Sequence, residues 1–543
     1  MSFRQLTLAT LALQLALVAP ITGSALAQTP AARSFDVVIY GGTAGGVVAA
    51  VSAARMGLTV ALLEPTPHVG GMVTGGLSAT DHGEKIVVGG DALAFYRRVG
   101  GKYGVPLFWY PEPKVAEAVL NEMLAEQKNV TLFLRHRLRE RGGVRKTGAN
   151  ITELVTENGA RFRGKIFVEA SYEGDVMSQA GVRYTVGREA TSAYGETLAG
   201  VRPKDRNHQF DVKVPARDER GRLLPEISPL PRGEIGTGDT RVQAYNFRLI
   251  LTTEKANQVP FERPAGYTPH RYELLRRFID VVERERGTPP KLTELLLMRA
   301  DLPHHKADFN NRGPFSTDYI GASYDYPDGT YATRARIWRD HVLYTKGLLY
   351  FLATDPRLPM SIRNAMNEWG LAKDEFVDNG NWPYQLYVRE GRRMLGDFVM
   401  TQKDLQSELT KPDAIAMGSY NSDSHNVQRF VQSDGSVQNE GNMEVRVEPY
   451  QIPYRVLLPR RAEAANLLVP VPFSASHVVY SSMRMEPQYM MIGQAAGVAA
   501  ALALRSGVGV HDIDVAELRR TLKTQGMVDS YDPATAPGVP RLP

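Results

Sequence analysis

The sequence contains no cysteine, and this absence removes several kinds of chemistry at once. A chain without thiols forms no disulfide, holds no thiolate-bound metal and runs no thiol redox cycle. The sequence also lacks the HExxH pattern of zinc hydrolases and the Gly-x-Ser-x-Gly pattern of serine hydrolases. His304 and His305 are adjacent, which is not the spacing of metal ligands. We therefore expect neither a metal site nor a hydrolase nucleophile.

Long runs of like charge are absent as well. The formal net charge is +5 over 543 residues, and the basic residues are spread along the chain. Nothing in this pattern indicates a nucleic-acid partner. Apolar residues make up 43% and charged residues 23%, which is typical of a globular protein with two or more domains. The apolar run Leu6–Val18 is too short for a stable membrane span.

The N-terminus has the pattern of a secretory signal peptide. Arg4 precedes the apolar run, and Ala25-Leu26-Ala27 supplies small residues before Gln28. We expect residues 1–27 to be removed on export, which makes the mature protein periplasmic or secreted. There is no twin arginine, so the Sec route is favoured. A retained membrane anchor is the alternative interpretation.

A glycine-rich turn lies between a predicted strand, 37–40, and a predicted helix, 45–56, and a second predicted strand follows at 59–63. Two later segments, 455–459 and 466–470, are also predicted to be strands. This order begins a parallel, Rossmann-like sheet with a dinucleotide pyrophosphate at the helix N-terminus. Glu64 lies where an acid accepts hydrogen bonds from a ribose, and an acid there argues against NADP. The predicted cofactor-binding residues of this segment are Gly41, Gly42, Thr43, Ala44, Gly45, Gly46 and Glu64. A close-packed turn without ligand is the alternative.

The residues after Glu64 favour FAD over NAD. Gly70, Gly71 and Met72 belong to a glycine-rich stretch that suits a flat cofactor running on beneath the backbone. FAD is usually retained by its enzyme, which suits a compartment without free nicotinamide. The missing cysteines exclude a cysteinyl flavin link, whereas a covalent link through His68 stays open.

At these residues the chain resembles the glutathione-reductase superfamily of flavoproteins, and more narrowly a family of largely exported bacterial FAD-dependent oxidoreductases. The first turn of that family typically reads Tyr-Gly-Gly-Thr-Pro-Ala-Gly, and here residues 40–46 read Tyr-Gly-Gly-Thr-Ala-Gly-Gly. Further similar segments are Glu169–Asp175, Tyr384–Arg393, Tyr420–His425, Ser474–His477, Arg484–Pro487 and Gly493–Gly497.

The resemblance implies an α/β fold, with a Rossmann-like FAD-binding domain of glutathione-reductase type built from both ends of the chain. We expect its parts at residues 35–190 and 455–510, an inserted α+β substrate domain at 191–454 and a C-terminal extension at 511–543. The isoalloxazine would lie near Gly70–Gly76 and near the start of a C-terminal helix, at Gly493, Gln494 and Gly497. The small residues of this helix, predicted at 490–504, also indicate that another segment packs very close to it. The amides of that helix would stabilise reduced flavin.

Five residues are candidates for binding or proton transfer at the substrate. His477 follows an apolar run in a Ser-rich turn, and Arg484 either clamps a carboxylate or hydroxyl group or pairs with Glu486. Asp423 and His425 have the i, i+2 spacing that lets a carboxylate orient an imidazole on an extended segment. Asp81 follows the flavin-side glycines. Each has a purely structural alternative: a bonded core histidine, an ion pair or a polar loop.

Together these features predict an exported FAD-dependent oxidoreductase that removes hydride from a C–H bond of an alcohol, a sugar derivative or another small polar molecule. The electron acceptor is left open between oxygen, a quinone and a periplasmic carrier. Alternatives are reduction of an activated double bond, amine oxidation, and a flavin- or sugar-binding protein without turnover. The arginines 389, 392 and 393 are interpreted as a solvated, ion-paired face of a helix-like run with Glu390.

Overall fold

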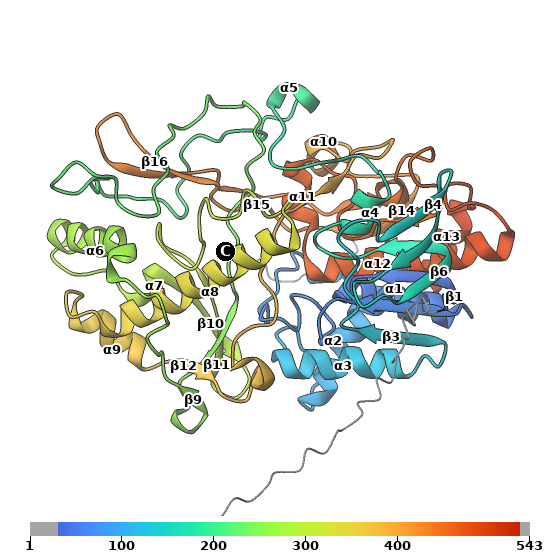
Figure 1. Cartoon of the computed structure of the whole chain (residues 1–543), viewed down its shortest axis with the longest axis horizontal. Helices are drawn as coiled ribbons and strands as arrows, with labels where there is room; N and C mark the ends of the chain where they lie inside the picture. The colour runs from blue at the N-terminus through green and yellow to red at the C-terminus, as the bar shows by residue number, and fades with distance from the viewer. Residues whose placement is uncertain (1–30, 533–543) are drawn as a thin grey trace, which may run out of the picture.

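The computed structural model describes residues 31–532, so the expected signal peptide, 1–27, and the end of the expected C-terminal extension lie outside the described residues. Figure 1 shows two lobes. The N-terminal segment (blue) and the C-terminal segment (red) lie together in the first lobe, and the middle of the chain (green to yellow) forms the second. None of the helices between residues 31 and 532 has the length and apolar character needed to cross a bilayer.

The first lobe is built on a seven-stranded sheet with the order β3-β2-β1-β6-β5-β4 and β20 paired to β6. The pairings among β3, β2, β1, β6 and β20 are parallel, whereas β4 and β5 extend the sheet antiparallel. All five residues of β2 are buried, as expected of a strand covered on both faces. The strands are β1 (Arg33–Tyr40), β2 (Val60–Glu64), β3 (Val130–Leu134), β4 (Val144–Thr147), β5 (Asn150–Val155), β6 (Arg161–Glu169) and β20 (Leu467–Leu468).

Two helices from opposite ends of the chain pack closely against each other in this lobe. They are α1 (Ala44–Arg55) and α12 (Glu486–Ser506). A Cβ added at Gly493 would lie 2.1 Å from the Gly45 carbonyl oxygen, and one at Gly497 would lie 2.4 Å from that of Ala49. The small residues of α12 therefore permit the crossing. The other helices here are α2 (Gly90–Lys102), α3 (Pro113–Ala125), α4 (Asp175–Gln179), α11 (His477–Met483) and α13 (Val515–Thr524).

The second lobe holds an antiparallel five-stranded sheet with the order β10-β11-β8-β12-β9. Its strands are β8 (Leu249–Thr252), β9 (Gln258–Val259), β10 (Leu296–Leu302), β11 (Lys306–Asn311) and β12 (Gly370–Ala372). Its helices are α6 (Glu273–Arg286), α7 (Leu292–Leu295), α8 (Tyr331–Thr354) and α9 (Met360–Asn367). Helix α8 begins at an N-cap, Thr330, whose side chain accepts a hydrogen bond from the Thr333 amide. Its N-terminal end contacts the first lobe through Tyr331 and Arg334, and the helix runs away from that lobe toward α9 (Figure 1).

Short elements connect the two lobes. They are β7 (Tyr184–Thr185), α5 (Thr191–Tyr194), β13 (Arg393–Met394), α10 (Gln402–Gln406), β14 (Ala414–Gly418), β15 (Ser422–Ser424), β16 (Gln428–Val431), β17 (Val437–Glu440), β18 (Met443–Val445) and β19 (Tyr450–Pro453). Strand β14 pairs with β19 and contacts α12 and α13 of the first lobe. Contacts therefore cross the expected domain limit at residue 454, and the limits themselves stay predictions.

Two expectations about local structure are wrong, and a third is confirmed in part. The segment predicted as a strand from Arg455 to Pro459 is a 3₁₀ turn, Tyr454–Leu457. The strand predicted from Asn466 to Pro470 shortens to β20, because only Leu467 and Leu468 reach a partner, β6. The arginine run at 389–393 is not helical: its first residues are irregular and its end forms β13 against β7.

Candidate cofactor groove and adjoining cavity

The glycine turn at the start of α1 is fixed by one threonine. Thr43 is the N-cap of α1: its Oγ1 accepts a hydrogen bond from the Gly46 amide at 3.1 Å and donates one to the Ala170 carbonyl at 2.8 Å. Gly41 has a φ of +100°, and a Cβ there would lie 2.5 Å from the Ser171 nitrogen. The turn therefore needs glycine, and it holds a helix N-terminus, whose free amides favour an anion, at the end of the sheet.

Glu64 is buried beside this turn and is held by backbone amides. Its two carboxylate oxygens accept hydrogen bonds from the Gly42 amide at 2.7 Å and the Thr66 amide at 2.8 Å. Burial raises the pKa of Glu64 to about 7. Each oxygen keeps a lone pair, so the carboxylate can still accept a hydrogen bond from a ligand hydroxyl.

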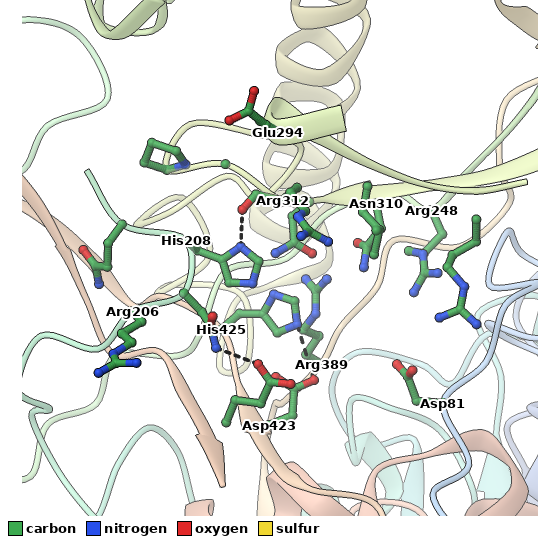
Figure 2. Close-up of a pocket in the computed structure, with 18 of the residues that line it drawn as sticks. Asp81, Arg206, His208, Arg248, Glu294, Asn310, Arg312, Arg389, Asp423 and His425 are labelled. Carbon is green, nitrogen blue, oxygen red and sulfur yellow. Dashed lines mark hydrogen bonds and ion pairs between the residues drawn. The ribbon is translucent and has the colours of Figure 1, made fainter. Parts of the chain in front are cut away.

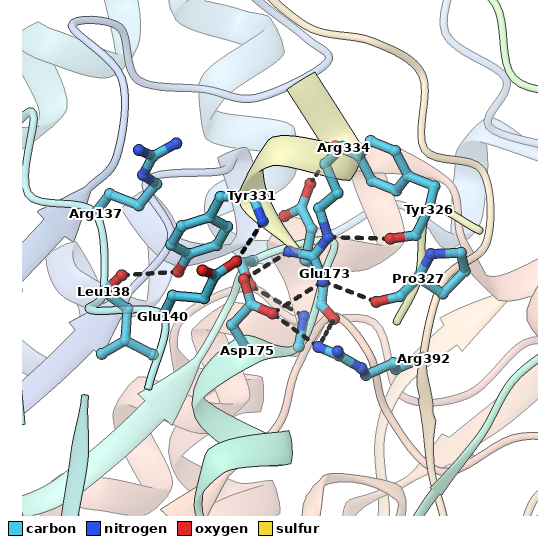
Figure 3. Close-up of polar contacts among 12 residues, drawn as sticks. Arg137, Leu138, Glu140, Glu173, Asp175, Tyr326, Pro327, Tyr331, Arg334 and Arg392 are labelled. Atoms are coloured by element: carbon cyan, nitrogen blue, oxygen red, sulfur yellow. Dashed lines mark hydrogen bonds and ion pairs between the residues drawn. The ribbon is translucent and has the colours of Figure 1, made fainter. Parts of the chain in front are cut away.

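A groove of about 220 Å³ runs past the turn and is closed by α8 of the second lobe. From the first lobe it is lined by Gly41, Thr43, Glu64 and Gly71, and from α8 by Tyr331, Arg334, Ala335 and Trp338. Figure 3 shows how α8 is fastened. The guanidinium of Arg334 donates to both oxygens of Asp175, at 2.8 and 3.0 Å, and Arg392 adds a third bond at 2.7 Å. Although burial alone raises the pKa of Asp175, these two arginines lower it overall.

The loop at residues 70–72 continues the groove toward the first turn of α12. Gly70 and Gly71 have φ values of +100° and +57°. The Met72 amide donates to the Tyr172 hydroxyl at 2.9 Å, and that hydroxyl donates to Glu486 at 2.7 Å. Burial raises the pKa of Glu486 to about 8. Glu486, the first residue of α12, is thus linked to the loop at residues 70–72 through Tyr172.

The expected helix start at Gly493 is therefore wrong. Gly493 and Gly497 lie two turns or more inside α12, where they contact α1 rather than the groove. The Gln494 side chain accepts from the Asp91 amide at 2.8 Å, at the start of α2. The sequence signal was misread because small residues serve helix packing as well as cofactor approach.

The groove fits FAD by its chemistry and its shape. Three features lie together in it. Gly41 leaves a space that a Cβ would fill, Thr43 caps the N-terminus of α1, and Glu64 is a buried acid. The groove is continued by two segments, 71–81 and 385–389, whose later residues line a second cavity. A long cofactor lying along these segments would have one end in the groove and the other beside that cavity.

The second cavity has a volume of about 480 Å³ and gathers four of the five candidate residues. Asp81, Asp423, His425 and Arg484 all line it. Figure 2 shows His425 between His208 and Asp423, with Arg389 beside it and Asp81 on the side of Arg248. Other lining residues are Ala79, Asn310, Tyr387, Tyr420 and Glu444. Segments far apart in the sequence therefore build one polar cavity.

His425 is held by a carboxylate that the sequence did not predict. Its Nδ1 lies 2.6 Å from Asp318 Oδ2, whereas its Nε2 is 3.9 Å from Asp423 Oδ2. The carboxylate that orients the imidazole is thus Asp318, and the expectation that Asp423 does so is wrong. Burial and Arg389 lower the pKa of His425. Burial raises the pKa of Asp318, but Arg389 and His425 bring it down to about 2.

His477 does not line the cavity. Ser476 caps α11, so His477 is the first residue of a helix and is 2% exposed. Its Nδ1 lies 2.8 Å from Glu390 Oε2. Burial alone raises the pKa of Glu390, yet His477 and Arg393 lower it to about 2. The structure therefore places this candidate histidine in a buried ion-pair network, and it does not face the cavity.

The arginines also differ from expectation. Arg484 is not paired with Glu486; it donates to the Tyr387 hydroxyl at 2.9 Å and to the Asp423 carbonyl at 2.8 Å. Arg389 is not solvated but fully buried, 3.2 Å from Asp318. No spacing in the sequence marks Asp318 or Arg389 as partners of residue 425, because all three meet only through the tertiary fold.

The chain is 29% identical over 190 residues to digeranylgeranylglycerophospholipid reductase 2 of Methanothermobacter thermautotrophicus, covering 32% of this chain and 44% of that relative. It therefore spans less than half of that relative's length.

Partial likenesses to solved structures include thioredoxin reductase of T. acidophilum, at 23% identity and a TM-score of 0.17 over 25% of this chain and 35% of that one. THI4 of Thermovibrio ammonificans matches at 19% identity and a TM-score of 0.22 over 30% of this chain and 71% of that one. The model of the FAD dependent oxidoreductases matches residues 36–522, which include both the groove and the cavity. The chain belongs to this family, and it is an FAD-dependent oxidoreductase.

Proposed function

We propose that the enzyme oxidises an alcohol, a sugar derivative or another hydroxyl-bearing small molecule bound in the 480 Å³ cavity. The observation that carries this proposal is the pair formed by His425 and Asp318. An Nδ1–H that donates to Asp318 at 2.6 Å leaves Nε2 without a proton. A neutral imidazole of this kind is a base for a substrate hydroxyl.

The chain's own residues have separate tasks in this scheme. His425 takes the hydroxyl proton, and Asp318 is a positioning residue that holds the imidazole in one tautomer. Asp423, to which Tyr420 donates at 3.2 Å, accepts a hydrogen bond from the substrate on the opposite side. Bound FAD supplies the acceptor for the hydride that leaves the substrate carbon. Closure of the groove by α8 keeps the cofactor in place.

Four finer points belong to the same proposal. The first lobe is of glutathione-reductase type, with the second lobe inserted into it, supported by a parallel sheet to which both chain ends contribute. The protein is exported to the periplasm or beyond, supported by the pattern of residues 1–27 alone. FAD is held by the turn at 41–46, Glu64, the loop at 70–72 and the first turn of α12. The electron acceptor would be oxygen, a quinone or a periplasmic carrier.

The test is reduction of the bound flavin without oxygen. We expect the yellow enzyme to bleach on mixing with at least one member of a panel of alcohols and sugar derivatives, followed by absorbance in a stopped-flow instrument. Bleaching by amines alone would assign amine oxidation instead. An enzyme that bleaches only with an artificial reductant and recolours with an enoate would be a double-bond reductase, and the proposal would be wrong.

The pH dependence of that reduction follows from His425. Burial and Arg389 lower the pKa of His425. The imidazole therefore stays neutral at pH values below about 6.5, which is the usual pKa of histidine. A base must be unprotonated to act, so the rate of flavin reduction is expected to stay constant from pH 8 to about pH 6.5 and to fall only at lower pH. A rate that already falls between pH 8 and pH 7 would contradict the assignment. The measurement is the stopped-flow rate at saturating substrate.

A further inference from the structure

We propose that the substrate carries a carboxylate that binds between Arg389 and Arg484, so that its class is a small hydroxy acid. The oxidation itself rests on the function proposed above, whereas the binding of the carboxylate does not. The argument depends on hydrogen-bond donors that the described part of the chain leaves without partners.

Arg389 is buried with most of its donors unused. Its NH1 donates to the Ala244 carbonyl at 2.8 Å and lies 3.2 Å from Asp318. Its Nε and NH2 have no hydrogen-bond partner among residues 31–532. An unpaired buried N–H of a charged group is costly, and such groups are rare unless a ligand completes them. Arg389 is one of the residues that line the cavity, so a ligand bound there would lie next to it.

Arg484 lies near the same aromatic ring as Arg389, that of Tyr387, and has one unpartnered donor in the described residues. This donor is its Nε, and its guanidinium carbon lies 5.6 Å from the centre of the Tyr387 ring. The guanidinium carbon of Arg389 lies 4.5 Å from the same ring. The Tyr387 hydroxyl accepts from Arg484, and its own proton is free to donate. Two guanidinium groups and a phenol thus offer donors at one place.

Two other arginines that line this cavity have carboxylate partners for their guanidinium groups. Arg248 donates twice to Asp308, at 2.8 Å each. Arg286 is paired with Asp211 and with Glu294, both at 2.7 Å. The lining as a whole contains seven arginines and five carboxylates. The excess of arginines therefore favours an anionic ligand in the cavity. The unpartnered donors place its binding site at Arg389 and Arg484.

The acids nearby restrict the kind of anion. Asp318 lies beside Arg389, and Asp423 Oδ2 lies 3.6 Å from Arg484. A doubly charged phosphate would meet both carboxylates, whereas a singly charged, planar carboxylate matches a guanidinium edge. In the reaction the carbinol C–H bond breaks and its electron pair leaves as hydride to the oxidised flavin. The hydroxyl proton goes to His425, and the alcohol becomes a carbonyl, so that a hydroxy acid yields an oxo acid.

Binding is tested first, with a compound that cannot react. The probe 2-hydroxyisobutyrate has a hydroxyl and a carboxylate but no carbinol C–H bond, and its amide is the neutral control. By calorimetry on the FAD-loaded enzyme we expect the acid to bind about 100-fold more tightly than the amide. In Arg389→Met this preference is expected to disappear, and Arg484→Met is the second variant. Arg286→Met, which removes a paired arginine at the same cavity, is expected to keep it.

Stability separates this role from a structural one. Arg389→Met also takes away the charge that faces the buried Asp318, so its melting temperature is expected to fall. Arg484→Met faces Asp423, which is partly exposed, and is expected to lose the preference for the acid while it keeps the parent's melting temperature. The inference is overturned if acid and amide bind alike, if Arg389→Met keeps the preference, or if glycerol 3-phosphate binds more tightly than glycerate. If the enzyme binds carboxylates selectively but glycerate and gluconate do not bleach the flavin, the proposed oxidation is wrong and the carboxylate site stands. If glycerol or sorbitol bleaches the flavin but carboxylates do not bind selectively, the carboxylate site is wrong and the proposed oxidation stands.

Discussion

Replacing Gly46 with alanine is expected to give a protein that no longer retains FAD and that unfolds at a lower temperature. A Cβ at this position would lie 1.9 Å from the Gly41 carbonyl oxygen and 3.1 Å from the Ala170 side chain. The first contact is with backbone, which cannot turn aside, so α1 must move away from the turn. We expect the stability of the first lobe to fall by about 3 kcal/mol, at the upper end of what overpacking costs.

The matched control is Gly101→Ala, near the end of α2. A Cβ at Gly101 would have nothing within 4 Å. Alanine forms helix better than glycine, so this change is expected to be neutral or to stabilise by up to about 1 kcal/mol. The measurements are the ratio of flavin to protein absorbance after purification and the melting temperature. A yellow Gly46→Ala protein with the parent's melting temperature would show that the turn tolerates the extra methyl group.

Local features of the fold were predictable because they depend on residues close together in the sequence. The strand, turn and helix at 33–55 follow from short-range patterning and from glycine conformations, and Thr43 and Glu64 hold the turn by contacts within that unit. The contact between α12 and α1 was foreseen only as close packing around Gly493 and Gly497. Its partner could not be named, because α1 lies more than 400 residues away in the chain.

The cavity was predictable only in part. Four of its residues were chosen from loop position and residue type, and the structure brings them together. The same reasoning favoured His477, which fails because a capping serine turns the segment into a helix. Asp318 and Arg389 were missed because their roles come from burial. A carboxylate and a guanidinium look like solvated charges in a sequence until the fold shows that water is excluded from them.

Replacing His425 with glutamine is expected to slow flavin reduction by about 1,000-fold, within the range for removal of a general base. Glutamine keeps a hydrogen-bonding side chain but takes up no proton near neutral pH. Substrate affinity should change little, because the carboxylate and the hydroxyl keep their other partners. Asp318→Asn is expected to slow reduction about 100-fold, since the amide holds the imidazole tautomer less firmly. Asp318 also raises the pKa of His425. In Asp318→Asn the reduction rate is therefore expected to begin to fall at a lower pH than in the parent.

His477→Gln is the control that makes this result specific. Both histidines are buried and each lies within 3 Å of a carboxylate, but only His425 lines the cavity. Glutamine at 477 removes one of the side chains that hold the buried Glu390 carboxylate, another being Arg393. We expect this change to lower the melting temperature while the reduction rate stays within about twofold of the parent. Stopped-flow reduction and thermal unfolding on the same preparations separate the two effects. If His477→Gln abolished reduction and His425→Gln did not, the base would be His477, and the cavity beside Asp318 would not be where the substrate reacts.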